Sequence, residues 1–293
     1  MEELFSSDFF RGLDRLSLVV KRDVSGRFRG ERRSVKHGSS VEFADYRDYS
    51  PGDDMRYVDW NVYARVDKLL IKLFRDEEDI EVYMVVDNSP SMRFGEPSKH
   101  LFARRLAAAL SYIILSGGDR CVVSVFDSGG LKRLPALRGK RAVPELMRFF
   151  GTDHPSSAET GFNAACTAVA AESRPSGVVV VISDLLFAED YRIGLKHLAS
   201  QRHDVYLIHC LAESEINPDL KGDVRVVDSE TSEIRDVSVG PRLLRHYQAA
   251  LEEFCGEAER FCHAYGMKYT RLVTATPLKE VLFRSLVADG YLR

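Results

Sequence analysis

Hydrophobic and polar positions follow two alternating patterns along most of the chain. Short apolar runs rich in β-branched residues are typical of buried strands. They lie at residues 79–86, 121–126, 178–182, 205–210 and 268–273. Segments with apolar residues at helical spacing lie between and after them, at residues 99–115, 142–150, 160–173, 190–200, 241–266 and 277–288. Strands that alternate with helices predict an α/β fold, with a mostly parallel sheet and helices on both faces.

Two shorter patterns add strands to this core. Residues 131–134 follow a Gly-Gly pair and predict a strand that returns beside residues 121–126. Residues 224–227 and 234–237 predict a β-hairpin inserted near residues 224–239, before the longest helix.

The N-terminal quarter of the chain has a different pattern. Residues 4–21 carry apolar residues at near-helical spacing and predict a helix. Residues 22–74 are rich in charge, glycine and aromatics without a sustained period, and residues 68–74 are their best strand candidate. We therefore expect residues 1–78 to be an extension packed on the core, with Trp60 as an anchor, and residues 79–293 to form the α/β domain.

Composition and charge are typical of a globular protein and give little support to a nucleic-acid-binding function. The chain of 293 residues has 45% hydrophobic and 29% charged residues and a net charge of −3, which is ordinary for a globular protein and does not favour a dedicated nucleic-acid binder. A basic stretch at residues 21–36 precedes an acidic one at residues 42–59, which favours an internal ionic network over a phosphate-binding surface.

The cellular location is also constrained by the sequence. No apolar stretch approaches the roughly 18 residues that a membrane span requires, and the first residues lack the pattern of a secretory signal. The five cysteines are odd in number, and several lie inside apolar runs. We therefore expect reduced, buried thiols and a cytoplasmic protein without a membrane span.

Oxygen-bearing side chains follow the predicted strands at positions where ligands bind in α/β sheets. The first strand leads into Asp87, Ser89 and Ser91, a later helix begins near Thr160, and the 178–182 strand is followed by Asp184. Ligands of such sheets bind beyond the carboxyl ends of the strands. Carboxylate and hydroxyl oxygens suit a hard cation, Mg²⁺ or Mn²⁺, which takes about six ligands. The alternative is that Asp87 and the serines only cap a turn.

This constellation resembles a known metal site. Asp-x-Ser-x-Ser after a first strand, Thr at the start of a helix and Asp after a later strand are similar to the metal-ion-dependent adhesion site (MIDAS) of von Willebrand factor A domains. The preceding segment resembles the bacterial domain-of-unknown-function-58 (DUF58) family. The matching motifs are Gly30-Glu-Arg-Arg-Ser34, His37-Gly38, Glu42-Phe43, Asp45-Tyr-Arg47, Tyr49-Ser-Pro-Gly-Asp-Asp54, Arg56-Tyr-Val-Asp-Trp60 and Ala64-Arg65.

The resemblance implies a fold, a site and a partner. It implies a von Willebrand factor A-like domain in which Asp87, Ser89 and Ser91 match the first metal loop and Asp184 the last. Members of the family are often associated with MoxR-type AAA+ ATPases, and longer relatives carry membrane segments that we do not expect here.

The position of Thr160 departs from the family pattern. The family has Gly-Gly before this threonine, whereas Ala158 and Glu159 precede it in this chain. Glu159 competes with Thr160 as a ligand, and other hydroxyls nearby are alternatives. These are Thr152, Ser156 and Ser157.

The sequence favours a binding protein over an enzyme. It contains no GxxxxGK[ST] phosphate loop and no GxSxG nucleophile elbow, and Ser89 stands where aspartyl phosphatases have a second aspartate. His209 lies in a strand-like run, as a core histidine would. We expect a metal-dependent protein-binding module whose partner offers an acidic side chain to the ion. The alternative is a metal-dependent phosphohydrolase in which the same cation activates water.

Overall fold

The computed structural model of the chain describes residues 7–19, 42–75, 80–127, 130–152, 161–173, 177–229 and 233–293. They belong to two compact units. One, the core unit, combines residues 1–21 with residues 80–293, and the other, the hairpin unit, comprises residues 22–79. The boundary differs from the predicted one, because residues 1–21 group with the core.

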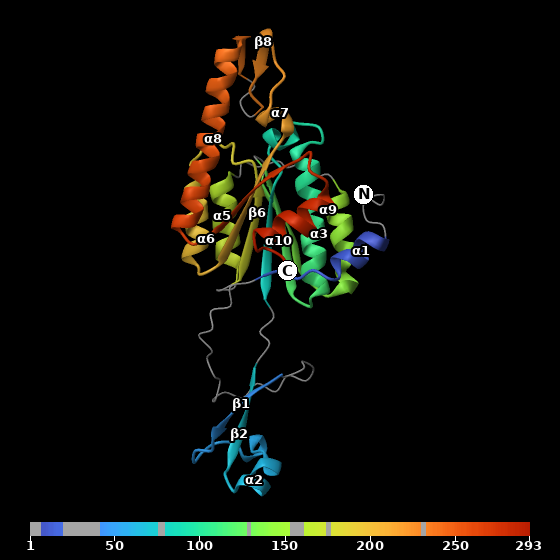
Figure 1. The fold of residues 1–293 in the computed structure, drawn as a ribbon, viewed down its shortest axis with the longest axis vertical. Coiled ribbons are helices and arrows are strands. Elements are labelled where there is room, and N and C mark those ends of the chain that lie inside the picture. Colours follow the sequence, from blue (N-terminus) through green and yellow to red (C-terminus); the bar gives the residue numbers. More distant parts are fainter. Residues whose placement is uncertain are drawn as a thin grey trace. The chain divides into compact units, whose positions relative to one another are not determined.

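A six-stranded sheet forms the centre of the core unit (Figure 1). Its order is β10-β7-β6-β3-β4-β5, and every neighbouring pair is parallel except β4 and β5. The predicted mostly parallel sheet is confirmed, including the return strand. The bounds are β3 Glu81–Asp87, β4 Arg120–Asp127, β5 Gly130–Arg138, β6 Val178–Ser183, β7 Asp204–Leu211 and β10 Lys268–Val273.

Helices cover both faces of the sheet, as predicted (Figure 1). One face packs against α1, α3, α4 and the C-terminal helical segments, and the other packs against α5, α6 and the second half of α8. Their bounds are α1 Ser7–Leu13, α3 Lys99–Ser116, α4 Val143–Gly151, α5 Phe162–Glu172, α6 Tyr191–Ser200 and α8 Pro241–Ala264. Short 3-10 turns lie at Pro90–Arg93 and Lys140–Ala142.

Two strands and one helix show why the carboxyl edge of the sheet is well defined. β6 consists of buried β-branched residues up to Ser183, which suits a strand covered on both faces. β3 lies between β6 and β4, and it is buried to its last residue, Asp87. α3 begins after Ser98, whose hydroxyl accepts a hydrogen bond from the Leu101 N–H and caps the helix. These elements place the loops after β3 and β6 and the start of α3 together.

The first helix is shorter than the pattern predicts. The sequence predicts a helix over residues 4–21, but α1 ends at Leu13. Beyond it the backbone is drawn into pairing with the C-terminus: the Ser17 N–H donates to the Arg293 carbonyl, and Leu18 forms a bridge with Leu292. These long-range bonds replace the local helical ones.

The C-terminal helix predicted at residues 277–288 is irregular. It consists of the α-helical turn α9, a π-helical segment and the α-helical turn α10. Their bounds are α9 Leu278–Glu280, π Val281–Ser285 and α10 Leu286–Ala288. Val281 and Leu282, in the π-helical segment, are fully buried in the core. The apolar contacts of these side chains offset the less regular backbone hydrogen bonds of the segment.

The hairpin unit is organised around Asp59. Strand β1 pairs with β2 in antiparallel register, which confirms the strand predicted at residues 68–74. The Asp59 carboxylate caps α2 by accepting from backbone N–H groups, accepts from the Tyr46 hydroxyl at 2.8 Å and pairs with Lys72 at 3.0 Å. The packing of this unit on the core, with Trp60 as its anchor, stays a prediction. The bounds are β1 Glu42–Asp48, β2 Leu70–Arg75 and α2 Trp60–Val66, with a 3-10 turn at Met55–Tyr57.

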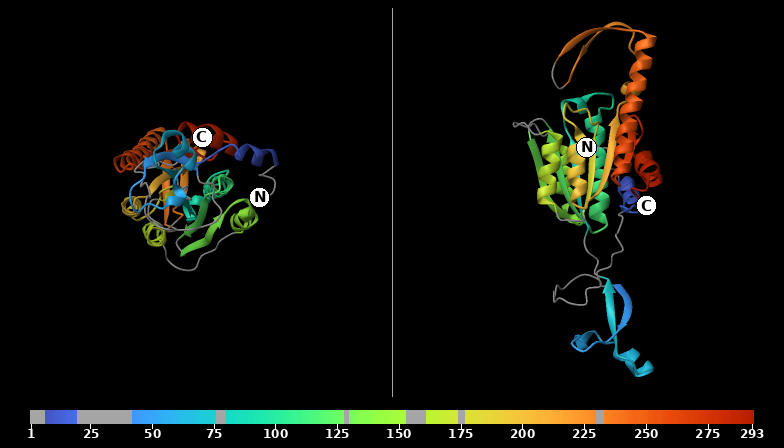
Figure 2. Two further views of the ribbon diagram at one scale, coloured as in Figure 1. Left: turned by 90° about the horizontal axis from the view of Figure 1, so that it is seen from below. Right: turned by 90° about the vertical axis from the view of Figure 1, so that its left-hand side faces the viewer.

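A protruding arm lies at the carboxyl edge of the core sheet. The chain leaves β7 through α7 (Glu213–Ile216), forms the predicted hairpin of β8 (Gly222–Val227) and β9 (Ile234–Val239), and then enters α8. The first half of α8 and the β8–β9 hairpin extend past the core sheet (Figure 2). Within the described ranges, none of the helices has the length and apolar character needed to cross a bilayer.

Candidate metal centre

The loop after β3 brings the predicted aspartate and serines together. The Ser89 N–H donates to Asp87 Oδ1 at 2.8 Å, which turns the chain directly after the strand. The Ser89 and Ser91 hydroxyl oxygens lie 3.0 Å apart, and all three side chains are buried. The loop therefore gathers one carboxylate and two hydroxyls within a small buried space.

The turn after β6 faces this loop. The Ser183 hydroxyl donates to Asp87 Oδ2 at 2.6 Å, joining the ends of the two neighbouring strands. The same hydroxyl oxygen accepts the Leu185 N–H at 2.9 Å, and Asp184 Oδ1 accepts the Leu186 N–H at 3.0 Å. Leu185 is buried with a φ of 59°. A left-handed conformation at a leucine costs energy and persists at sites held by their surroundings.

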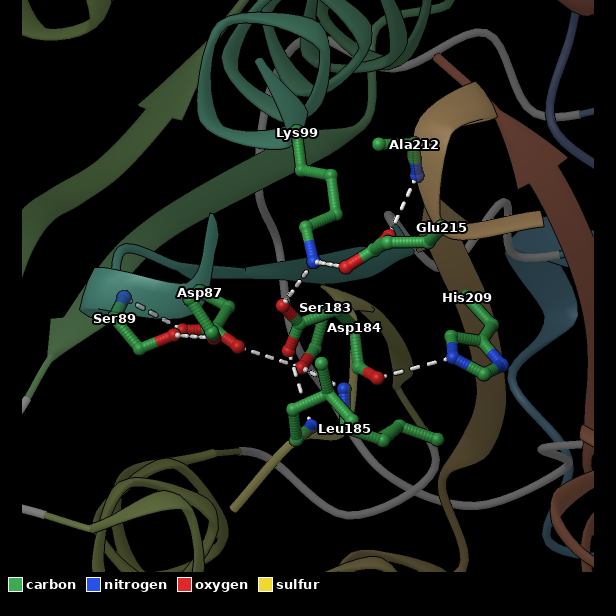
Figure 3. Close-up of polar contacts among 11 residues, drawn as sticks. Asp87, Ser89, Lys99, Ser183, Asp184, Leu185, His209, Ala212 and Glu215 are labelled. Carbon is green, nitrogen blue, oxygen red and sulfur yellow. Dashed lines mark hydrogen bonds and ion pairs between the residues drawn. The ribbon is translucent and has the colours of Figure 1, made fainter. Parts of the chain in front are cut away.

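A buried lysine lies beside the predicted aspartate. Lys99 reaches from the first turn of α3, and its Nζ lies 2.8 Å from Asp184 Oδ2 (Figure 3). It also pairs with the Glu215 carboxylate from α7, which in turn accepts the Ala212 N–H at 2.7 Å. Burial lowers the pKa of Lys99, but the charges of Asp184 and Glu215 outweigh burial and raise it above its usual value. Lys99 is therefore a cation.

The charges in this cluster do not balance. Asp87, Asp184 and Glu215 contribute three carboxylates against the single ammonium of Lys99. Burial, followed by the nearby charge of Asp184, raises the pKa of Asp87 to about 7. Because the buried carboxylate of Asp87 is ionised less readily here than in water, the cluster favours an additional positive charge beside it.

The residues present fit a divalent cation. Such an ion supplies the missing positive charge, and Asp87, Ser89 and Ser91 offer the oxygen donors that Mg²⁺ prefers. Both Asp184 oxygens already have a partner, Lys99 or the Leu186 N–H, so Asp184 is better suited to act through water than directly. Across the described ranges no three His, Cys, Asp or Glu side chains form a metal cluster, so the serine hydroxyls would have to complete the ligand set.

The predicted fourth ligand lies outside the described residues. Thr160 falls there, as do its alternatives Ser156, Ser157 and Glu159. The remaining alternative, Thr152, is exposed and donates its hydroxyl to the Arg148 carbonyl. The role of Thr160 therefore stays a prediction.

His209 is a core histidine, as predicted. Its Nε2 lies 3.0 Å from the Asp184 carbonyl oxygen and its Nδ1 lies 2.9 Å from the Tyr269 hydroxyl. Burial lowers the pKa of His209 to about 4, so the ring is neutral at neutral pH. It supports the turn that carries Asp184.

Sequence reasoning did not single out Lys99, Glu215 or the role of Ser183. A lysine in the first turn of the helix that follows the predicted metal loop was one available signal. Glu215 follows β7, whose end lies at the same edge of the sheet as those of β3 and β6. The pairing of Lys99 with a residue 116 positions away had no local signature.

The comparisons with known proteins agree with the sequence resemblance. The family model described as "Protein of unknown function DUF58" matches residues 45–254. An uncharacterized protein of Mycobacterium tuberculosis, strain H37Rv, is 28% identical over 264 residues, which is 88% of this chain and 83% of that protein.

Two solved structures are similar to the chain at low identity. The conserved hypothetical protein BatB from Bacteroides thetaiotaomicron is 16% identical, with a TM-score of 0.43 over 72% of this chain and 98% of that one. The von Willebrand factor type A protein from Catenulispora acidiphila is 12% identical, with a TM-score of 0.40 over 75% of this chain and 43% of that one.

Proposed function

The chain belongs to the DUF58 family, and we propose that it is a metal-dependent protein-binding module. The observation that carries the proposal is the buried cluster at the carboxyl edge of the sheet. There Asp87, Ser89 and Ser91 converge from one loop, and Ser183, the neighbour of Asp184, is hydrogen-bonded to Asp87 from the adjacent strand. The excess of carboxylates over the ammonium of Lys99 creates the demand for an additional cation.

The ion would be held mainly by one loop. Asp87, Ser89 and Ser91 would ligate Mg²⁺ or Mn²⁺, with Thr160 as the predicted further ligand and Asp184 acting through water. When bound, the ion supplies a site for an oxygen ligand from outside the chain. Few of its protein ligands are charged, so an incoming carboxylate is favoured, and water can hold the position in the free protein. An acidic side chain of a protein partner is therefore the proposed ligand.

The family resemblance supplies the first candidate partner. A MoxR-type AAA+ ATPase would provide ATP hydrolysis, and this chain would connect it to proteins that are assembled or matured. The proposal places the chain in the cytoplasm, because all five cysteines are free and buried, as expected in a reducing compartment.

The test is capture of partners by the full chain from native lysate. We expect a partner in Mg²⁺ that is lost in chelator and lost with the double variant Ser89→Ala/Ser91→Ala. The matched control is Ser200→Ala/Ser238→Ala, which removes two exposed hydroxyls elsewhere and should retain the partner. Capture that ignores both the chelator and the loop serines would contradict the proposal.

The phosphohydrolase alternative is tested by an assay of turnover. Both ring nitrogens of His209, which lies beside the Asp184 carbonyl, already have partners, so this histidine is not a suitable general base for that reaction. Metal-dependent turnover of a phosphate ester that is lost in Asp87→Asn would support the alternative instead.

A further inference from the structure

A largely apolar cavity lies between the first half of α3 and the segment after β10. Its volume is about 160 Å³, room for about five water molecules at liquid density. Most of its wall is apolar, but one arginine, Arg105, and two threonines, Thr274 and Thr276, also line it. The lining includes Pro97, Phe102, Arg105, Thr274, Pro277 and Leu278.

Two polar atoms of residues that line this cavity are buried without partners. The Arg105 Nε and the Thr274 Oγ1 are buried, and neither has a hydrogen-bond partner. Arg105 also has no ion pair among the residues that the structure describes, and the Thr274 residue is only 2% exposed. Buried polar groups in proteins are nearly always hydrogen-bonded, and leaving one unpaired is costly. Two such groups lining one cavity indicate a site built for a ligand.

The chemistry of the cavity favours a carboxylate. A guanidinium group binds a planar carboxylate through two parallel N–H bonds, and a threonine hydroxyl can donate a third bond. Arg105 is the only cationic side chain in the lining, whereas a phosphate dianion would need more positive charge. The apolar wall of Pro97, Phe102 and Leu278 suits the methylene groups of a glutamate side chain.

The cavity lies on the same side of the molecule as the candidate metal centre. Thr274 directly follows β10, and β10 runs parallel to β7, β6 and β3, so all four end at one edge of the sheet. Arg105 lies six residues after Lys99 in α3, which is roughly 9 Å along the helix axis. One extended acidic segment can therefore reach both places.

We propose that this cavity is a second binding site, in which Arg105 and Thr274 hold a glutamate or aspartate side chain of the partner. The inference rests on the proposed function for the identity of the partner, because another carboxylate of the same acidic segment would occupy the metal ion. The cavity then fixes the register of the segment, and the metal makes its binding reversible.

The direct test needs no partner and no metal. In chelator, the Nε–H resonance of Arg105 is followed by nuclear magnetic resonance while N-acetylglutamate is added to the full chain. We expect a saturable shift that is absent with N-acetylglutamine, which has the same shape without the charge. Thr274→Val should weaken the binding about tenfold, because one hydrogen bond to a charged group is lost. Arg284→Gln, which changes an exposed arginine, should leave the binding unchanged.

Three results would overturn the inference. A response that does not saturate shows that no site exists, and an equal response to N-acetylglutamine shows that charge is not recognised. Tighter binding of inorganic phosphate shows that the site is for a phosphate and not for an acidic protein segment.

The metal claim and the cavity claim fail separately. Arg105→Gln should weaken capture of the partner in Mg²⁺ while Mg²⁺ binding by the chain itself stays unchanged. If the wild-type chain does not bind Mg²⁺ but its Arg105 resonance still responds to N-acetylglutamate, only the proposed function is contradicted. Unchanged capture by folded Arg105→Gln would contradict the second site alone.

Discussion

The Lys99 ammonium lies 2.8 Å from an Asp184 carboxylate oxygen, and neither side chain reaches solvent. The candidate metal centre therefore contains a permanent monovalent cation, held by the first turn of α3. This lysine neutralises part of the charge that the strand ends bring together and leaves the rest for an ion. It also fixes Asp184 in one orientation before any ion arrives.

Replacing Lys99 tests this arrangement. Lys99→Met should lower the free energy of unfolding by about 3–5 kcal/mol, because it leaves Asp184 and Glu215 without their cation. Urea denaturation in chelator measures the change, with the exposed Lys279→Met as the control. Addition of Mg²⁺ should restore part of the loss. Unchanged stability of Lys99→Met would show that the ion pair is not part of the folded cluster.

The N-terminal helix should be part of the folded core. Leu13 is fully buried against the core unit, so Leu13→Ala should destabilise it by about 2–5 kcal/mol. Leu220→Ala, at a residue that is 47% exposed, should change stability by less than about 0.5 kcal/mol. Thermal unfolding of both variants makes the comparison. Equal stabilities would mean that residues 1–21 do not pack on the core in solution.

The hairpin unit should be sensitive to acid through Asp59. Hydrogen bonds from Tyr46 and then from Lys72 lower the pKa of Asp59 to about 2. A carboxylate with a depressed pKa stabilises the folded state above its unfolded pKa of about 3.9, and this contribution disappears as pH falls towards 2. The fluorescence of Trp60, the single tryptophan, should report unfolding of this unit in that window.

The control for the acid transition is Asp59→Asn, which cannot titrate. Its hairpin unit should be less stable at neutral pH, and its stability should change little between pH 4 and pH 2. If wild type and variant lose the Trp60 signal over the same pH range, another group is responsible.

Much of the fold could be predicted because its signals are local. The β-branched run of β6 and the apolar spacing of α3 each identify an element without reference to the rest of the chain. Asp87, Ser89 and Ser91 could be predicted as a group for the same reason, since they occupy one loop after one strand. Parallel strand order then predicts that Asp184 approaches them.

Features that depend on distant residues could not be predicted in this way. Nothing in the local pattern shows that Lys99 will meet Glu215, because the pairing requires the folded edge of the sheet. The early end of α1 likewise depends on Ser17 pairing with Arg293 at the other end of the chain. In both places long-range contacts decide a structure that propensity and spacing leave open.

The central claim is that the strand-end loop binds a divalent cation, and calorimetric titration of Mg²⁺ into the full chain tests it most directly. We expect one bound ion per chain for the wild type. Asp87→Asn keeps the size of the side chain but removes its charge. Removing a residue that only supports a metal ligand already weakens metal binding by about tenfold or more, so removing the charge of a ligand itself should weaken Mg²⁺ binding at least about tenfold. Ser200→Ala should leave binding unchanged. Equal binding of Mg²⁺ by wild type and by folded Asp87→Asn would contradict the claim.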